Sequence, residues 1–204
     1  MKLLYQTHSP HARKVLVFAH EAGLAEGIIV EHQETSPTRA NEAVFEQNPL
    51  GKVPVLLRPG SDPLFDSDVI CAYLDTLRNG PPLIPLSGEA RWRALRMQSV
   101  AQDLANSGIA LRWETVRRPE ALRYPPLQDG YARKLDKTYR WLDTKIETDD
   151  PLHVGEIALA AVLDWFEFRD LPSFRSHPRL SKWFDGFAQR PSMQATPLAG
   201  DTQD

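Results

Sequence analysis

The segment from Thr7 to Val15 separates a short apolar run from an amphipathic one, and it constrains the fold more than any other part of the chain. Ser9 is a favoured N-cap residue, and Pro10 suits the first helical position because its missing N–H would have no partner inside a helix. The short segment 2–6, which is apolar in its centre, predicts a strand. The pattern therefore predicts a strand that delivers a serine hydroxyl to the first turn of a helix, where unpaired N–H groups favour an anion.

The rest of the first eighty residues predicts a small α/β layer. Apolar residues at helical spacing favour a helix that continues to Ala22, with Gly23 just beyond its end. The β-branched run 28–30 suits a buried strand parallel to the first one, because a helix connects the two. The elements expected after this β-α-β unit are a short helix over 41–47, strands over 55–57 and 64–65, and a helix over 67–77.

Two further backbone features indicate a ligand. Pro54 stands directly before a predicted strand, and a cis Val53–Pro54 bond would turn the backbone outward and leave the Val53 N–H and C=O unpaired. Asp66 and Ser67 stand at the start of the next helix. They form a second helix N-terminus that favours an anion, on the same small domain as Ser9.

In this combination the chain resembles the cytosolic glutathione transferases, specifically the bacterial type whose first helix opens Ser-Pro-x-x-Arg-Lys. The matching elements occur in the family's order and comprise Ser9 to Lys14, Asn48 to Leu56, and Asp66-Ser67. The resemblance runs along nearly the whole chain. It implies an N-terminal thioredoxin-like domain that binds glutathione and an all-helical C-terminal domain that contributes the cleft for an electrophile.

A proline-rich stretch, 79–85, cannot continue a helix and indicates a boundary between the two halves. From Glu89 onward the periodicity is helical throughout. We therefore expect α/β plus all-α organisation, with domains over 1–79 and 89–204 joined by a linker over 80–88. Helices are expected over 89–116, 131–146, 152–165 and 178–189, with a loop around Pro119 and Pro125-Pro126.

One helix start departs from the family's pattern. The helix near Gly155 usually begins with Ser or Thr followed three residues later by an acid, which is a capping box. Glu156 supplies the acid here, but His153 stands where the hydroxyl is expected. We expect either an imidazole nitrogen in that role or a helix start weaker by about 1 kcal/mol.

The resemblance implies glutathione as cosubstrate. Its γ-glutamyl carboxylate is expected at Asp66-Ser67, and its cysteinyl unit is expected to pair in a strand-like manner with the backbone at Val53 and Pro54. Lys52, or alternatively Arg39, would reach the glycyl carboxylate.

The glutathione thiol would then lie beside Ser9. A thiol with a pKa near ~8.5 is only about 3% ionised at pH 7. A hydrogen bond to a charged acceptor contributes roughly 1.5–3 kcal/mol, equal to about one to two pKa units, and the helix dipole adds to it. Ser9 is therefore the expected catalytic residue, as a hydrogen-bond donor to the thiolate.

Each candidate has a structural alternative. Ser9 could serve only as an N-cap, and Tyr5 is expected in the core because it lies within the strand. His8 and His11 could assist proton transfer, although histidines in a turn more often face solvent. His11 and Trp113 are expected to line the electrophile cleft, together with Ser9 and the helices around Trp92 to Trp113.

Other polar residues are assigned structural roles. Arg13 and Lys14 could strengthen the field at the thiolate, but such charges usually lie on a helix surface. The set Arg91, Arg93 and Arg96, and the pair Arg117-Arg118, are expected to be solvated helix faces. Cys71 is expected to be a buried, small apolar residue. The six histidines show no metal-ligand spacing, so no metal is expected.

Composition restricts the remaining possibilities. A net charge of -3 gives no general attraction to nucleic acid or to an anionic membrane. A single cysteine excludes an internal disulfide, and the sequence shows neither a leader nor an apolar run of membrane-spanning length. We therefore expect a cytoplasmic protein.

The leading hypothesis is a glutathione transferase that adds the glutathione thiolate to a small hydrophobic electrophile, as an alkyl or aryl transferase in detoxification. A serine rather than a cysteine at position 9 favours conjugation over thiol exchange. The alternatives are a non-catalytic binding module that retains the fold, and a glutathione-dependent peroxidase, lyase or dehalogenase. A homodimer is expected from the resemblance alone.

Overall fold

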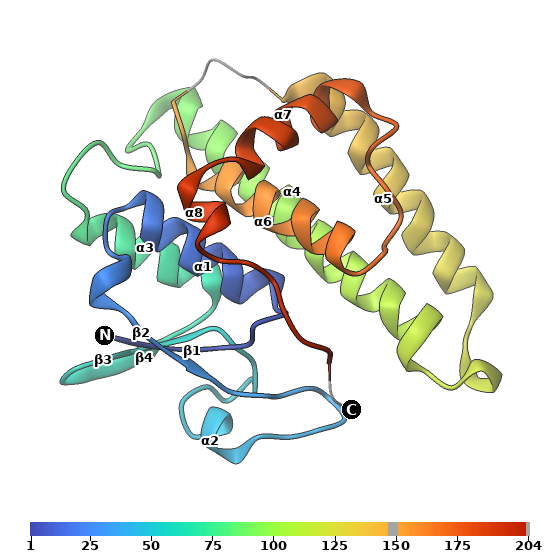
Figure 1. The fold of residues 1–204 in the computed structure, drawn as a ribbon, viewed down its shortest axis with the longest axis horizontal. Helices are drawn as coiled ribbons and strands as arrows, with labels where there is room; N and C mark the ends of the chain where they lie inside the picture. Colours follow the sequence, from blue (N-terminus) through green and yellow to red (C-terminus); the bar gives the residue numbers. More distant parts are fainter. Residues whose placement is uncertain (147–150, 203–204) are drawn as a thin grey trace.

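A computed structural model describes residues 1–146 and 151–202. Figure 1 shows a small sheet with helices on it, followed by a larger helical part, and the C-terminal tail returns toward the sheet. The thioredoxin-like layer followed by an all-helical part agrees with the expected fold class.

A four-stranded sheet forms the base of the N-terminal part, in the order β2-β1-β3-β4. Its strands are β1 (Lys2–Tyr5), β2 (Ile29–His32), β3 (Val55–Arg58) and β4 (Ser61–Leu64). β1 is parallel to β2, as predicted, and antiparallel to β3. The predicted burial of β2 is wrong: Ile29 is 68% and Val30 is 44% exposed, because β2 is an edge strand with a neighbour on one side only.

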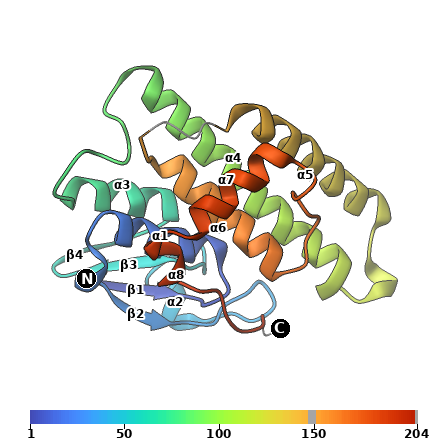
Figure 2. The same cartoon turned by 45° about the horizontal axis from the view of Figure 1, so that its top comes forward.

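Helices cover both faces of this sheet (Figure 2). Leu3 and Leu56 point to the face that carries α1 (Pro10–Glu21) and α3 (Ser67–Leu77). Their sequence neighbours Leu4 and Val55 point to the opposite face, as alternation along a strand requires, and pack with α2 (Glu42–Phe45). A short 3-10 helix, η1 (Ala25–Gly27), precedes β2.

The helical part follows the segment 78–87. It contains α4 (Gly88–Arg112), the π-helical turn η2 (Trp113–Arg117), the 3-10 turn η3 (Glu120–Leu122), α5 (Pro125–Lys145), α6 (Val154–Phe168), α7 (Pro178–Ala188) and α8 (Pro191–Gln194). No strand follows Leu64 within the described ranges. Two expectations are corrected. The proline pair belongs to the first turn of α5 rather than to a loop, since proline is tolerated there, and α8 was not predicted.

The helix α4 continues through Gly108 without a break, and α6 approaches α4 closely at this glycine. A Cβ atom at Gly108 would lie 2.7 Å from Cζ of Phe166. Near the other end of the contact, a Cβ atom at Gly155 would lie 2.6 Å from Cβ of Met97. These two glycines bring α6 against α4, so α6 lies in the middle of the molecule, between α4 and α1.

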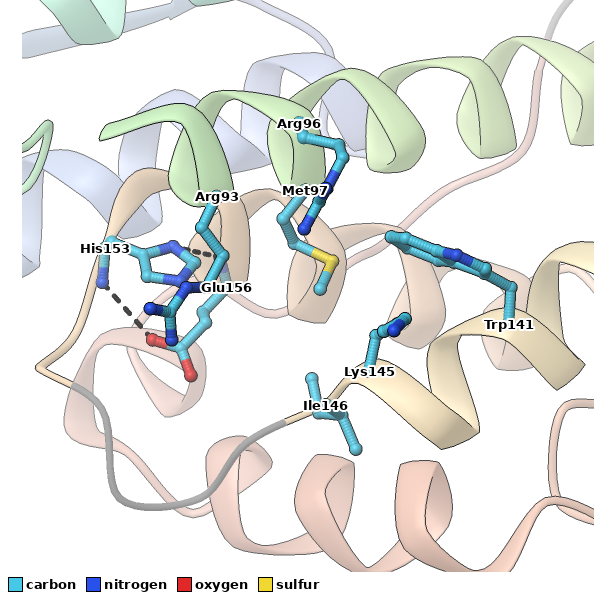
Figure 3. Close-up of a pocket in the computed structure, with 8 residues that line it drawn as sticks. All are labelled: Arg93, Arg96, Met97, Trp141, Lys145, Ile146, His153 and Glu156. Carbon is cyan, nitrogen blue, oxygen red and sulfur yellow. Dashed lines mark hydrogen bonds between the residues drawn. The ribbon is translucent and has the colours of Figure 1, made fainter. Parts of the chain in front are cut away.

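The start of α6 contains the capping box with the substituted residue (Figure 3). The His153 N–H donates to Oε2 of Glu156 over 3.2 Å, and the Glu156 N–H donates to Nδ1 of His153 over 3.3 Å. Of the two expected alternatives, the structure shows the first, with an imidazole nitrogen in place of the hydroxyl. Both residues line a small cavity of about 140 Å³, together with Arg93 and Arg96.

Candidate active site

Ser9 lies in the turn between β1 and α1, as predicted, and is 8% exposed. Its Oγ accepts a hydrogen bond from the Ala12 N–H at 3.2 Å, which makes Ser9 the N-cap of α1 with Pro10 at the first helical position. The cap bond uses a lone pair of the hydroxyl, so the hydroxyl hydrogen can still be donated. Because the first turn of α1 contains no acidic residue, nothing on that turn opposes an anion beside Ser9.

The Val53–Pro54 peptide bond is cis, which is the case considered from the sequence. Within residues 1–146 and 151–202, neither the N–H nor the C=O of Val53 has a hydrogen-bond partner. The loop before it is held in place by Asn48, whose Nδ2 donates to the Lys52 C=O at 2.8 Å, and by Thr35, whose hydroxyl donates to the Gly51 C=O at 2.9 Å.

Asp66 and Ser67 share the start of α3. The Asp66 carboxylate caps the helix, accepting from the Asp68 N–H at 3.0 Å and the Val69 N–H at 3.4 Å. Ser67 is 1% exposed, and its Oγ has no hydrogen-bond partner in the described part of the chain. A buried hydroxyl without a partner is costly, so this arrangement favours a ligand that supplies one.

Two cations on α1 are buried, which corrects the prediction that they lie on a helix surface. Lys14 pairs with Asp68 on α3 and donates to Gln102 on α4 at 3.4 Å. Arg13 pairs with Asp164 on α6 and donates to the Met193 C=O at 3.3 Å. Both side chains fix α1 to its neighbours, because α1 is enclosed between the sheet and the helical part.

Two histidines flank Ser9. His8 is buried, not solvent-facing as expected, and its C=O accepts from Nε1 of Trp165 at 3.0 Å. Burial lowers the pKa of His8, while the nearby Glu34 carboxylate opposes this change. Burial also lowers the pKa of His11 to about 4, the Lys14 charge acts in the same direction, and a hydrogen bond with Asn106 opposes it. A pKa of about 4 leaves the His11 imidazole neutral at pH 7.

The remaining candidates take structural positions. Tyr5 packs edge-on against His32, with ring centroids 6.2 Å apart, and burial raises its pKa. Cys71 is fully buried, as predicted, and burial raises the pKa of its thiol to about 12, which leaves it protonated and inert. Lys52 and Arg39 are exposed on neighbouring loops, and Arg39 bridges to Ser36.

An open groove of about 590 Å³ runs between α3 and α4, from Arg91 to Asn106. Neither Ser9 nor the two predicted electrophile contacts, His11 and Trp113, belong to its lining. His11 instead contacts Asn106 at the far end of the groove, and Trp113 lies seven residues later, about two turns along the same face.

Sequence reasoning missed two residues that support the Ser9 turn. Trp165, which holds the His8 carbonyl, lies in the apolar pattern of α6 and carries no signal that separates it from core residues. Glu34, whose carboxylate lies 3.3 Å from Nε2 of His8, stands in a polar loop with no recognisable motif.

The described residues contain no helix that is both long and apolar enough to span a membrane. They also contain no group of three or more histidine, cysteine or acidic side chains placed to hold a metal ion.

Residues 8–77 match the model of the glutathione S-transferase N-terminal domain. The chain is 28% identical over 206 residues to an uncharacterized GST-like protein of Escherichia coli K12, covering 96% of this chain and 98% of that protein. A glutathione transferase family member from Pseudomonas fluorescens Pf-5, whose structure contains glutathione, superposes with a TM-score of 0.93 at 32% identity, over 98% of this chain and 99% of that one. A glutathione S-transferase from Methylobacterium radiotolerans in complex with glutathione sulfonate superposes with a TM-score of 0.87 at 26% identity, over 100% of this chain and 97% of that one.

The three relatives match the chain over both of its halves. The chain belongs to the glutathione transferase family.

Proposed function

We propose that this protein is a glutathione transferase in which the Ser9 hydroxyl stabilises the thiolate of glutathione for attack on an electrophile. The observation that carries this proposal is a set of unused polar groups in one domain. They are the buried Ser67 hydroxyl, the Val53 backbone and the hydroxyl hydrogen of Ser9. Related proteins whose structures contain glutathione or glutathione sulfonate support it.

Each of these groups suits one part of the tripeptide. The start of α3 would hold the γ-glutamyl carboxylate through the Ser67 hydroxyl and the helix N–H groups, while Asp66 faces the ammonium group. The Val53 N–H and C=O would pair with the cysteinyl unit as an added strand. Lys52, at the exposed end of the same loop, would meet the glycyl carboxylate.

The chemistry supplied by bound glutathione is a nucleophilic sulfur. Ser9 does not need to lose its proton, because it acts as a donor to sulfur rather than as a base. One charge-assisted hydrogen bond, together with the N-terminal dipole of α1, lowers the thiol pKa by about one to two units. Ionised sulfur then becomes about a quarter to three quarters of the bound population at pH 7.

The thiol proton of glutathione goes to solvent rather than to a histidine beside Ser9. His11 is neutral and has a pKa of about 4, so it is a weak base at pH 7. It adds no positive charge beside the sulfur, and the Lys14 charge is paired with Asp68, so the N-terminal dipole of α1 supplies the field at Ser9. We infer that His11 and Trp113 contact a small hydrophobic electrophile, and that the protein is a cytoplasmic homodimer that acts in detoxification.

The test is calorimetric titration with glutathione, followed by conjugation assays with a panel of aryl halides, epoxides and unsaturated carbonyl compounds. Saturable binding together with turnover of at least one class supports transfer. Binding without turnover on the whole panel indicates a binding module instead, and the absence of binding heat contradicts the proposal. Assays with organic hydroperoxides separate a peroxidase from a transferase. Light scattering of the same sample measures the oligomeric state.

A further inference from the structure

The start of α3 carries negative charge at the place where a carboxylate of glutathione is expected. Asp66 caps this helix and Asp68 lies in its first turn, so an acidic residue stands on each side of Ser67. The first turn of α1, by contrast, contains no acidic residue. A carboxylate gains from a helix N-terminus, but each neighbouring negative charge opposes that gain. The γ-glutamyl carboxylate at Ser67 therefore requires a compensating positive charge nearby.

The two aspartates differ in what offsets their charge. In the proposed binding mode, Asp66 faces the ammonium group of the γ-glutamyl unit. Its exposed carboxylate also accepts from the N–H groups of Asp68 and Val69. Asp68 has no such counterpart on the ligand, because glutathione carries a single ammonium group. The charge of the Asp68 carboxylate, whose side chain is only 36% exposed, has to be offset by the protein.

Lys14 of α1 supplies this charge. Its Nζ forms an ion pair with the Asp68 carboxylate and donates to Oε1 of Gln102 on α4 at 3.4 Å. The Lys14 side chain is 3% exposed, and lysine is almost never buried to this extent unless it is paired. Burial of an ammonium group costs free energy, which the carboxylate and the amide oxygen offset. The cation is therefore held in one place, between α3 and α4.

This ion pair joins the two helix starts of the proposed glutathione site. The helices α1 and α3 lie side by side on one face of the sheet (Figure 2). Lys14 lies five residues after Ser9, which is about 7 Å along the helix axis. Asp68 directly follows Ser67. The pair therefore connects the helix that faces the sulfur to the helix that faces the γ-glutamyl carboxylate.

The same charges act on two neighbouring side chains. Burial is the main cause of the lowered pKa of His11, the Lys14 charge adds to it, and the charges of the two aspartates oppose it. Burial is also the main cause of the raised pKa of Cys71, where Lys14 opposes the change and both aspartates add to it. Such effects require charges close to the affected group. Lys14, Asp66 and Asp68 thus share one local environment.

We propose that Lys14 is a positioning residue of the glutathione site, which neutralises Asp68 and so keeps the start of α3 favourable for the γ-glutamyl carboxylate. This inference rests on the proposed glutathione transfer and concerns the same site. Lys14 acts through Asp68 and does not touch the tripeptide. Without Lys14, the Asp68 carboxylate stays charged beside Ser67 and repels the ligand's carboxylate. The structural alternative is that the pair only fastens α3 to α1.

The experiment compares three thiol tripeptides by calorimetric titration. They are glutathione, glutaryl-Cys-Gly, which lacks the ammonium group, and γ-aminobutyryl-Cys-Gly, which lacks the α-carboxylate. Lys14→Met keeps the length of the side chain without its charge. It should weaken binding of glutaryl-Cys-Gly by about 10-fold, because the unpaired Asp68 repels the carboxylate. Glutathione should lose about three- to tenfold, since its ammonium group is attracted by the same charge. Binding of γ-aminobutyryl-Cys-Gly should stay the same or tighten.

Two further variants separate charge compensation from direct contact. The double variant Lys14→Met with Asp68→Asn has neither charge, so its affinity for glutathione should return to within about twofold of the wild type. A direct contact between Lys14 and the tripeptide would stay lost in this variant. Asp68→Asn alone should bind glutaryl-Cys-Gly at least as tightly as the wild type, and it serves if Lys14→Met does not fold. Lys134→Met breaks an exposed ion pair with Asp103, between α5 and α4, and should change no affinity.

The outcomes separate this inference from the transferase proposal. Equal weakening of all three tripeptides by Lys14→Met overturns it, because that pattern indicates a structural role. Glutathione binding that the double variant does not recover overturns it too, as does weaker binding of glutaryl-Cys-Gly by Asp68→Asn. In these cases the transferase proposal stands if the wild type binds and conjugates glutathione. If the wild type gives no binding heat with glutathione, the transferase proposal itself fails, and this inference fails with it.

Discussion

The starts of α1 and α3 use serine in opposite ways. In α1, Ser9 is itself the N-cap, so one hydroxyl both closes the helix and faces the expected thiolate. In α3, Asp66 closes the helix and leaves the Ser67 hydroxyl uncommitted. Structural and ligand-binding roles are thus merged at one helix start and divided between two residues at the other. Substitution should therefore affect both stability and activity in α1, but ligand binding alone in α3.

The start of α6 shows the arrangement expected of a helix N-terminus that binds nothing. His153 and Glu156 satisfy one another's backbone N–H groups, and the box leaves no hydroxyl to donate. We call the starts of α1 and α3 open, because each has a serine hydroxyl that can donate to a ligand, and we call the start of α6 closed. This contrast predicts a different pattern of losses at each of them.

The largest effect is expected at Ser9. Ser9→Ala should lower kcat/KM for conjugation by about 10- to 100-fold and raise the pKa of the bound glutathione thiol by about one to two units. The reason is that the thiolate loses the hydrogen bond donated by Ser9. The variant should also unfold about 1 kcal/mol more easily, because the cap is lost. Rate measurements, ultraviolet titration of the thiolate and urea unfolding check these three changes.

Ser9→Thr keeps the hydroxyl and serves as the matched control, with most of the activity and stability retained. If Ser9→Ala loses stability but keeps its rate and thiol pKa, Ser9 is an N-cap and nothing more, and the merged role assigned to α1 is wrong.

A smaller effect with a different pattern is expected at Ser67. Ser67→Ala should weaken glutathione binding by about 10-fold, because the γ-glutamyl carboxylate loses one charge-assisted hydrogen bond. The free energy of unfolding without glutathione should stay the same or rise, since the substitution removes a buried hydroxyl that lacks a partner in the described structure. Calorimetric titration and urea unfolding measure the two quantities.

Ser61→Ala, at an exposed serine of β4, is the control for loss of a hydroxyl and should change neither quantity. A Ser67→Ala variant that unfolds more easily by 1 kcal/mol or more, without any change in affinity, would mean that its hydroxyl has a structural partner and that the division of roles in α3 does not exist.

The sequence predicted both open helix starts because their signals are local. A serine before a proline and an aspartate before a serine specify a cap within a few residues, whatever packs around them. For the same reason the sequence left only two alternatives at the start of α6, an imidazole cap or a weaker helix start, because His153 and Glu156 are spaced by one helical turn.

The errors concern residues whose environment is set by distant parts of the chain. Arg13 and Lys14 are buried because α6 and α3 supply Asp164 and Asp68. A local sequence pattern cannot predict partners that are so distant in the sequence. Arg117 was assigned to a solvated helix face, but it is half-buried. Burial and the charges of Arg112 and Arg169, at the ends of α4 and α6, lower its pKa. β2 was predicted to be buried from its β-branched residues, but strand order alone decides which strand is the edge.

The smallest effect is expected at the closed start of α6, and it should concern stability only. His153→Ala removes the acceptor for the Glu156 N–H and should lower the free energy of unfolding by about 1 kcal/mol. His153→Ser restores an acceptor of the ordinary capping-box type and should recover most of that loss. Glutathione affinity and kcat/KM should be unchanged in both variants, because the capping box lies at the opposite end of α6 from Trp165, and this helix of 15 residues is about 22 Å long. Urea unfolding and the conjugation assay, performed on the same preparations, measure both. If His153→Ala weakens glutathione binding and His153→Ser recovers it, the start of α6 affects the Ser9 turn. The distinction between open and closed starts would then be wrong.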